Sequence, residues 1–259
     1  MSLHSEQTGG VLRLTLDRPE KSNAFDDLVI SNLTEAFLLA AAEPSVRVVV
    51  LQASGKYFSA GGDLAWMQRM AGYSDAENLA DAKALARLMQ AIDLCPKPVL
   101  ARVQGSAFAG AVGLIACCDI AISVPAAQFA ITEVRLGLIP AVISPYVVRA
   151  IGVRNARRWS LTAERFSAEQ AKAMGLVHEV VEESQLDEAL QQQIDALLMA
   201  APSALAEAKS LLALVDQPLS ARVIDETAAR IARQRASAEG REGVAAFLEK
   251  RTPAWRSEP

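Results

Sequence analysis

The sequence predicts an α/β fold that is followed by a helical C-terminal segment. Strand-like runs alternate with helical stretches up to about residue 180, which is typical of parallel β units joined by helical crossovers. From about Glu183 onward, apolar residues recur at three- and four-residue spacing, and no convincing strand is present. We therefore divide the chain into an α/β core, residues 1–195, and a C-terminal helical segment, residues 196–259.

The first elements of the core follow from local patterns. The run VLRLTLD alternates apolar and polar residues, which predicts a strand over Val11–Asp17. A polar turn, RPEKSNAF, ends this strand, and Asp26 or Asp27 can cap a helix that runs to about Ala42. The apolar run VRVVVLQA over Val46–Ala53 is typical of a buried strand.

The rest of the core is predicted in the same way, from apolar runs bounded by Gly, Pro and polar residues. The expected elements are helices from about Leu64 to Leu94, a strand at Val99–Gln104, a small-residue helix to about Cys118, a strand at DIAISV, a short turn and helix over Phe129–Pro140, helix over most of Ala141–Leu161 and a short strand that starts near Gly175. The opening residues, MSLHSEQTGG, are expected to form a tail, and they lack the basic and apolar regions of a secretory signal.

Composition and charge exclude several classes of protein. The 259 residues are 51% hydrophobic and 22% charged, as in an ordinary globular protein. A net charge of -4 argues against binding to nucleic acid. The longest uncharged stretch, Val103–Cys118, is too short and too rich in Gly to span a bilayer. The three cysteines, Cys95, Cys117 and Cys118, lie in apolar sequence without metal-ligand spacing, which predicts reduced thiols and a cytoplasmic location.

The scarcity of histidine excludes further chemistry. Only His4 and His178 are present, so a His-rich metal site is impossible. A Ser-His-Asp triad would have to use His178, and the chain has no G-x-S-x-G motif to partner it. Neither of the common Gly-rich phosphate-binding motifs occurs. We therefore expect no metal and no separate cofactor, and we assign acid–base work to a carboxylate and oxyanion binding to backbone amides.

Two Gly-rich turns are candidates for presenting backbone amides. Phe58–Leu64 (FSAGGDL) follows a strand, and its glycines allow a tight turn and a close approach to a ligand. The alternative is a plain strand-to-helix turn capped by Asp63. Gln104–Gly113 (QGSAFAGAVG) also lies between a strand and a helix, where free amides of a first helical turn can face an anion. The alternative there is close packing of the helix on the sheet.

Glu133 is the candidate acid or base. It is a single carboxylate in the largely apolar run Thr132–Pro140 (TEVRLGLIP), and apolar surroundings raise the pKa of a carboxyl toward neutrality. The alternatives are a surface pair between Glu133 and Arg135, or a carboxylate that marks the start of a helix. Two amide-presenting turns and one carboxylate on successive units can surround one thioester.

The motifs also resemble those of a known family. They are RPEKSNAF, FSAGGDL, KPVLARVQGSAFAGAVGL, CCDIAIS, FAITEVRLGLIP, AERFSAEQAKAMGLVHEVV and AFLEKRTPAW. In order and spacing they resemble the crotonase (enoyl-CoA hydratase/isomerase) superfamily from Val11 to about Trp255. The resemblance implies a spiral of ββα units with a C-terminal helical trimerisation segment. SAGGDLAWMQ, GLIACCD and EVRLGLIPAVISPYVV are most similar to the methylglutaconyl-CoA hydratases of leucine breakdown and the isohexenylglutaconyl-CoA hydratases of terpene breakdown.

The resemblance implies roles for individual residues. Ala60 and Gly110 match the positions whose backbone amides form the oxyanion hole of the family. Glu133 matches the second of two catalytic glutamates, while the first falls at Gly113, so the chain departs from the two-glutamate pattern. The absent side chain at Gly113 is expected to leave room for a branched or larger acyl group. The nearby Asp119 is interpreted as structural.

The resemblance also implies contacts with the coenzyme A part of an acyl-CoA substrate. The implied contact residues are Lys21, Ala24, Ala60, Gly61, Gly62, Asp63, Leu64, Gly110, Phe247 and Lys250. For a lone lysine such as Lys21, the alternative is a solvated side chain that binds nothing. The resemblance further implies a homotrimer or a dimer of trimers, with Phe247 and Lys250 completing the site of the same or an adjacent chain.

These observations predict an enoyl-CoA hydratase for a branched or glutaconyl-type acyl group. One alternative is a Δ3-Δ2-enoyl-CoA isomerase, because moving a single proton between two carbons needs only the one carboxylate of Glu133. Another alternative is a catalytically weak acyl-CoA-binding paralogue, for which Gly113 is the sequence cue.

Overall fold

The computed structural model describes residues 2–256, in which two β-sheets are covered by helices. Residue 1 of the predicted core segment and residues 257–259 of the predicted C-terminal segment lie outside the described residues. All neighbouring strands of the six-stranded sheet are parallel except the first pair. In spatial order its strands are β1 (Leu3–Thr8), β2 (Val11–Leu16), β3 (Val48–Ala53), β5 (Val99–Val103), β7 (Ile120–Ser123) and β10 (Glu179–Val180).

The opening residues form a strand, so the expectation of a tail is wrong. β1 pairs antiparallel with β2, and His4 stands opposite Thr15. Gly9 and Gly10 make the connecting turn with φ angles of +55° and +80°, which glycine adopts without steric cost. The alternation in β1 is weak because five of its six residues are exposed, and an edge strand of this kind has no clear apolar period.

A second sheet of four short strands was not predicted. Its strands, each two or three residues long, are β4 (Tyr57–Ser59), β6 (Ser106–Phe108), β8 (Gln128–Ala130) and β9 (Phe166–Ser167), in that spatial order. Runs this short carry no detectable period, so the sequence predicted turns or no element at these positions. The pairing of β4 with β6 puts the ends of the two Gly-rich segments side by side.

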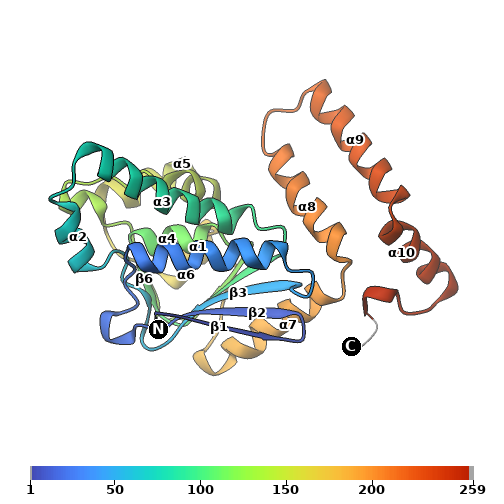
Figure 1. Ribbon diagram of the computed structural model, residues 1–259, viewed down its shortest axis with the longest axis horizontal. Helices are drawn as coiled ribbons and strands as arrows, with labels where there is room; N and C mark the ends of the chain where they lie inside the picture. Colours follow the sequence, from blue (N-terminus) through green and yellow to red (C-terminus); the bar gives the residue numbers. More distant parts are fainter. Residues whose placement is uncertain (1, 257–259) are drawn as a thin grey trace.

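Helices cover both sides of the larger sheet. In Figure 1, α1 (Asp27–Ala42) and α3 (Asp75–Asp93) lie above this sheet, and α7 (Leu186–Leu198) lies below it. Asp26 caps α1 as predicted, because its side chain accepts a hydrogen bond from Val29 N–H at 3.0 Å. The other helices of the core are α2 (Leu64–Met70), α4 (Gly110–Ala116), α5 (Ser144–Thr162) and α6 (Ala168–Met174). Because the sheet is covered on both faces, the residues Val48–Leu51 of β3 are completely buried.

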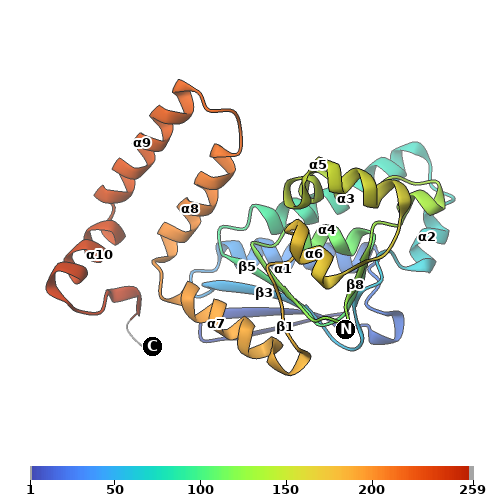
Figure 2. The same cartoon turned by 180° about the vertical axis from the view of Figure 1, so that it is seen from behind.

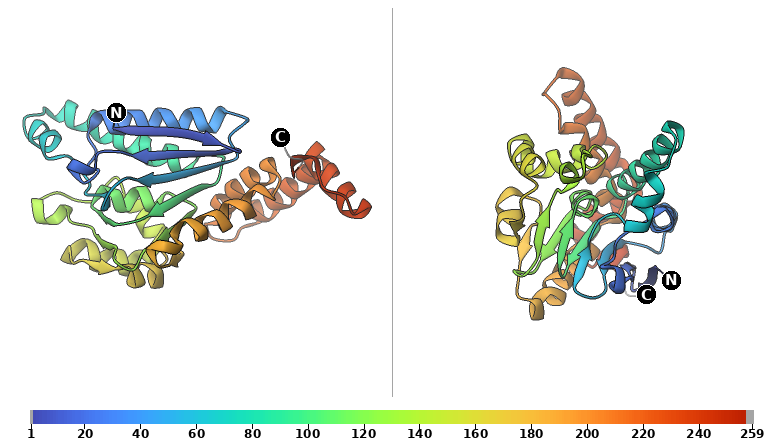
Figure 3. Two further views of the ribbon diagram at one scale, coloured as in Figure 1. Left: turned by 90° about the horizontal axis from the view of Figure 1, so that it is seen from below. Right: turned by 90° about the vertical axis from the view of Figure 1, so that its left-hand side faces the viewer.

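Three further helices extend away from the core, as Figures 1, 2 and 3 show. We call α8 (Pro202–Val215), α9 (Ala221–Ala236) and α10 (Ala238–Glu249) the C-terminal arm. Arg47 of the core holds the segment just before α8, since its Nη2 donates to Ala200 O at 2.7 Å. Large apolar side chains are exposed along the arm: Leu212, Val215, Leu219, Ile224, Ile231, Val244, Phe247 and Leu248.

The predicted division at residue 195 falls inside α7. Leu186, Leu190 and Ile194 of this helix are part of the main core, and Leu197 and Leu198 pack against it. The division itself stays a prediction, although the helices of the arm begin only at Pro202.

No single helix between residues 2 and 256 is long and apolar enough to cross a bilayer. One bent pair, Glu183–Leu198 with Pro202–Val215, meets the criteria of length and composition when its two parts are taken together across a 103° bend.

Candidate active site

The two Gly-rich segments meet where β4 and β6 end. Gly61 follows β4 with a φ of +90°, and a Cβ atom there would lie 2.8 Å from Phe108 O and 3.2 Å from Ala109 Cβ. Any side chain at position 61 would therefore push the two segments apart. The close approach explains why glycine stands at this position, and it brings the predicted amide donors to one place.

The structure corrects the role expected for Ala60. Its N–H donates a hydrogen bond to Ser22 O at 2.9 Å, so this amide is used by the fold. Two other amides of the meeting segments, Gly62 N–H and Gly110 N–H, have no hydrogen-bond partner among residues 2–256. The free donor of the first segment is therefore Gly62, two residues after the predicted one, and the prediction for Gly110 is consistent with the structure.

The residue before Gly110 adopts an unusual conformation. Ala109 has a φ of +50° and a ψ of −125°, a region that costs a non-glycine residue about 1–3 kcal/mol. Its own N–H donates to Ala130 O at 2.8 Å, which continues the pairing of β6 with β8. The turn at Ala109 then takes the next amide, that of Gly110, out of the sheet.

Glu133 begins the 3-10 helix η2 (Glu133–Leu136), three residues after β8. Its side chain is half-buried, and its Oε2 atom is buried with no hydrogen-bond partner in the described part of the chain. Burial raises the pKa of the Glu133 carboxyl, while hydrogen bonds from backbone N–H groups partly oppose this. No ion pair joins Glu133 to Arg135 between residues 2 and 256, so the surface-pair alternative is not supported.

The space expected beside Gly113 is already filled. Gly113 is buried within α4, and a Cβ atom there would lie 2.2 Å from Ile143 Cγ2 and 2.7 Å from Ile143 Cβ. The Ile143 side chain, which precedes α5, takes the volume that a carboxylate at position 113 would need. The expectation that this space receives an acyl group is therefore wrong, because two core helices close over it.

The Asp63 carboxylate serves the protein itself. It caps α2 by accepting hydrogen bonds from Ala65 N–H and Trp66 N–H. It also pairs with Lys21 Nζ at 3.0 Å and with Arg18 Nη2 at 3.3 Å. The hydrogen bond from Lys21 is the main cause that lowers the pKa of Asp63. With only 6% of its side chain exposed, this carboxylate is turned inward, and a contact between residue 63 and coenzyme A stays a prediction.

Three other predicted coenzyme A contacts, Lys21, Ala24 and Leu64, lie in or next to this group of charged side chains. The Lys21 side chain is 46% exposed although its ammonium pairs with Asp63, so it is neither buried nor free in solvent. Ala24 is buried, and its carbonyl accepts a hydrogen bond from Arg18 Nη1 at 3.1 Å. Leu64 is strongly exposed at the start of α2, directly after Asp63. Lys21 and Leu64 therefore remain available to a ligand that approaches the Gly-rich segments.

Phe247 and Lys250 lie far from the other predicted residues. They stand at the end of α10, where 82% of Phe247 is exposed. In Figures 1 and 2, α10 and α2 lie at opposite ends of the molecule. Phe247 and Lys250 therefore do not join the site of their own chain, which corrects one of the two expected arrangements.

The remaining polar residues singled out by the sequence have structural contacts. His178 Nδ1 accepts a hydrogen bond from Ala121 N–H at 3.0 Å. Asp119 accepts one from Val99 N–H and pairs with Lys209 Nζ of α8 at 2.7 Å, which agrees with its interpretation as structural. The three cysteines are free, and no cluster of potential metal ligands exists in residues 2–256.

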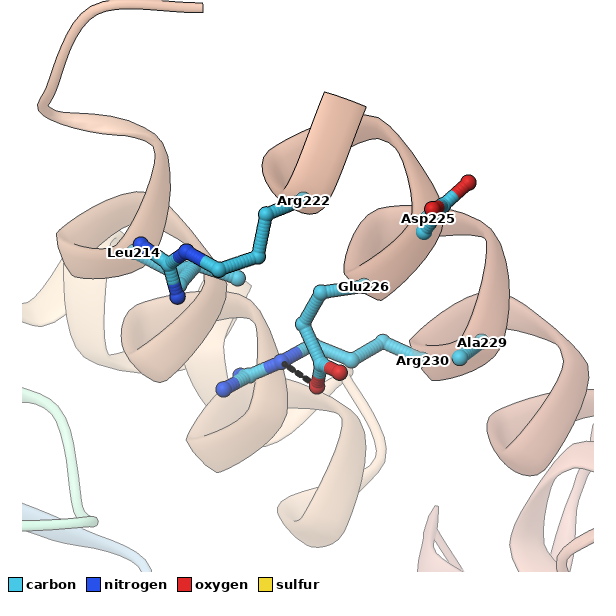
Figure 4. Close-up of a pocket in the computed structure, with 6 residues that line it drawn as sticks. All are labelled: Leu214, Arg222, Asp225, Glu226, Ala229 and Arg230. Carbon is cyan, nitrogen blue, oxygen red and sulfur yellow. Dashed lines mark hydrogen bonds and ion pairs between the residues drawn. The ribbon is translucent and has the colours of Figure 1, made fainter. Parts of the chain in front are cut away.

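A surface hollow between α8 and α9 contains none of the predicted residues. Figure 4 shows its lining, in which Arg230 Nε pairs with Glu226 Oε1 at 3.1 Å. The lining residues are Leu214, Arg222, Asp225, Glu226, Ala229 and Arg230. Because all of them belong to the C-terminal arm, this hollow is separate from the site formed by Gly62, Gly110 and Glu133.

Comparison with known proteins shows the family of this fold and site. The family model described as enoyl-CoA hydratase/isomerase matches residues 6–258. The chain belongs to the enoyl-CoA hydratase/isomerase family. Its fold is therefore the α/β crotonase fold, as predicted, and the expectation of an enzyme of the enoyl-CoA hydratase class is confirmed.

Individual relatives share most of their length with this chain. The crystal structure of an enoyl-CoA hydratase from Shewanella pealeana is 48% identical, with a TM-score of 0.96 and coverage of 98% of this chain and 96% of that one. The enoyl-CoA hydratase AKT6-1 of Alternaria alternata is 38% identical over 79% of this chain and 67% of its own length. A carnitinyl-CoA dehydratase of Salmonella typhi is 33% identical, with 98% of each chain covered.

Proposed function

We propose that this chain adds water across the α,β double bond of an enoyl-CoA thioester. The observation that carries the proposal is the pair of unpartnered amides, Gly62 N–H and Gly110 N–H, together with the unpartnered buried oxygen of Glu133. Buried polar groups normally have hydrogen-bond partners, so the open oxygen of Glu133, together with two free amides in connected segments, is suited to a ligand. The names of the relatives, two hydratases and a dehydratase, support a reaction that adds or removes water.

In this mechanism the two amides bind the thioester oxygen. Attack of water at Cβ moves the electrons of the double bond toward the thioester carbonyl, so negative charge develops on that oxygen. Donors that already point at the developing charge need no reorganisation, and each is worth about 3 kcal/mol. Gly62 and Gly110 are suited to this role because their N–H groups belong to two segments held together by the close contact at Gly61.

Glu133 handles the proton in both steps. Its carboxylate accepts a proton from water while the water oxygen bonds to Cβ, and an enolate forms on the thioester. The protonated Glu133 then donates this proton to Cα, which completes the addition and restores the carboxylate. A carboxyl whose pKa is raised by burial is suited to both accepting and donating a proton near neutral pH. One carboxylate thus does the work for which the family resemblance implies two.

The proposed substrate has a branched or glutaconyl-type acyl group of the kind met in leucine breakdown. Its support is the resemblance in SAGGDLAWMQ and EVRLGLIPAVISPYVV, since the space beside Gly113 does not provide room for it. The segment that follows Glu133 presents the exposed apolar side chains Leu136, Leu138 and Ile139. The apolar part of such an acyl group can cover these side chains.

The proposal includes an assembly in which neighbouring chains complete the coenzyme A site. Because Phe247 and Lys250 cannot reach their own site, they can contact coenzyme A only across a subunit boundary. The exposed apolar residues of the C-terminal arm support burial of the arm between chains, in a trimer or a dimer of trimers. The three free cysteines support a reducing, cytoplasmic location.

The deciding experiment is a panel of enoyl-CoA thioesters that includes crotonyl-CoA and methylglutaconyl-CoA. Loss of the enoyl absorbance with a mass gain of one water supports the hydratase.

The single carboxylate also favours a second candidate, the Δ3-Δ2-enoyl-CoA isomerase. Conversion of a 3-enoyl-CoA to its 2-enoyl isomer without uptake of water would establish that activity instead. Tight binding of acyl-CoA with no turnover of any thioester would indicate a binding paralogue.

A further inference from the structure

Phe25 lies between the two segments that carry the free amides. It is 2% exposed and sits in the turn that precedes α1. Its N–H donates to Gly61 O at 2.8 Å, and its carbonyl accepts from Asp63 N–H at 2.9 Å. These two hydrogen bonds enclose Gly62 on both sides, so the backbone of Phe25 holds the first amide donor in place.

The ring of the same residue touches the second donor. A Cβ atom on Gly110 would lie 2.7 Å from Phe25 Cζ, which means that the edge of the ring rests directly against the glycine backbone. The ring is supported from another side by Trp66, whose ring centroid is 6.4 Å away at a tilted angle of 50°. Phe25 thus contacts both segments. Its backbone bonds to the neighbours of Gly62, and its ring touches Gly110.

We propose that Phe25 is a positioning residue that sets the separation between Gly62 N–H and Gly110 N–H. This proposal rests on the proposed function, because the separation matters for an oxygen that both amides must reach. A phenyl ring has few internal degrees of freedom, so a buried ring is a stiff spacer. Two donors that share one oxygen must lie within a few tenths of an ångström of their working positions, and a shift of about 1 Å can cost about 100-fold in rate.

The first test removes the Phe25 ring and compares this variant with one that loses another buried phenyl ring of the core. Phe25→Ala deletes the ring but keeps both backbone hydrogen bonds, and Phe37→Ala deletes a fully buried ring of α1 as the matched control. With crotonyl-CoA as substrate, Phe25→Ala is expected to lower kcat by about 10- to 100-fold and to leave KM within about 3-fold. Phe37→Ala is expected to lower Tm by about as much as Phe25→Ala does. Its kcat is expected to stay within about 3-fold of the parent value.

The second test uses conservative replacement and compensation, and it remains informative where the alanine variants fold poorly. Phe25→Leu retains part of the side-chain volume at position 25. Its kcat is therefore expected to be well above that of Phe25→Ala and close to that of the parent. Gly110→Ala places a methyl group against the ring, so it is expected to lower kcat strongly in the parent. Because Phe25→Leu lacks the Cζ atom, Gly110→Ala is expected to cost several-fold less in that background. Equal costs in the two backgrounds would overturn the proposal.

Crystal structures of the Phe25→Leu and Phe37→Leu variants provide a readout that does not depend on turnover. The distance between Gly62 N and Gly110 N is expected to change only when Phe25 is replaced. An unchanged distance would overturn the positioning role even if the parent hydrates crotonyl-CoA. A changed distance in a protein that turns over no thioester would support the positioning role and refute the proposed function, so the two failures are distinguishable.

Discussion

The side chain of Ile143 occupies the volume next to Gly113 that any side chain at position 113 would need. The distances from a Cβ at Gly113, 2.2 Å to Ile143 Cγ2 and 2.7 Å to Ile143 Cβ, are shorter than real carbon contacts. Met89 Cε, at 3.4 Å, closes the space from another side. The absence of a carboxylate in α4 is therefore built into the packing of the core, and Gly113 is a packing position.

The first prediction concerns this contact. Gly113→Ala is expected to destabilise the protein by about 1–3 kcal/mol, because the added methyl group overpacks a filled region. Ile143→Ala in the same chain is expected to relieve part of this loss, so that the double variant is more stable than additivity predicts. Gly72→Ala is a suitable control, since a Cβ there meets only Arg69 O at 3.6 Å. Thermal unfolding measures the stability of the parent and the four variants, and strict additivity of the two single changes would contradict the packing argument.

Glu133→Gln is expected to lower kcat by about 10²- to 10⁴-fold, because the amide can neither accept nor donate the proton of the reaction. Binding of acetyl-CoA, measured by calorimetry, is expected to stay within a few-fold of the parent because the fold loses no partner of Glu133 Oε2. Glu183→Gln, at an exposed glutamate of the same chain, is the control and should be fully active. Near-normal hydration by Glu133→Gln would remove Glu133 from the mechanism.

The pH dependence of the reaction follows from the burial of Glu133. Burial raises the pKa of this carboxyl, and the proposed water-activating form is the ionised one. The rate is therefore expected to increase with pH as Glu133 loses its proton, and the midpoint of this limb in kcat/KM should lie above the ordinary glutamate value. A profile of kcat/KM between about pH 4 and pH 9 measures the midpoint. A midpoint at or below the ordinary value would be inconsistent with a desolvated carboxylate base.

The Asp63 cluster is expected to make part of the stability depend on pH. The hydrogen bond from Lys21 lowers the pKa of Asp63 in the folded state, so its contribution is complete above the unfolded pKa and is lost as pH falls through the folded pKa. Asp63→Asn should reduce stability at neutral pH by about 1–3 kcal/mol and flatten the fall in stability on acidification. Asp75→Asn, at an exposed aspartate, is the control. Denaturant unfolding at a series of pH values makes the comparison, and parallel curves would exclude this role.

The C-terminal arm is expected to be required for assembly and activity. A chain that ends at Ala200 should be aggregated or monomeric and inactive, because the arm is the proposed contact between subunits. In the full chain, Phe247→Ala and Lys250→Ala should each raise KM for an enoyl-CoA several-fold with little change in kcat, while Lys172→Ala on α6 should not. Light scattering at micromolar concentration measures the oligomer. A stable and active monomer of 27.6 kDa would refute the shared site.

Local sequence patterns determined much of this protein. The alternation in Val11–Leu16, the Asp26 cap of α1 and the buried run of β3 depend on neighbours in the chain, so they were predicted close to their observed bounds. Glu133 was also a candidate from its local sequence, as a lone carboxylate among apolar residues, and its role in catalysis stays a prediction. The resemblance to the crotonase superfamily added the overall fold.

Only the tertiary structure decided which groups are free to act. Ala60 N–H is taken by Ser22 O, a partner 38 residues earlier, so that Gly62 N–H is the free amide of this segment among the described residues. The space at Gly113 is closed by Ile143, which lies 30 residues later. Whether an amide is unpaired or a space is empty depends on what distant segments bring to it, and such contacts leave no periodic signal in the sequence.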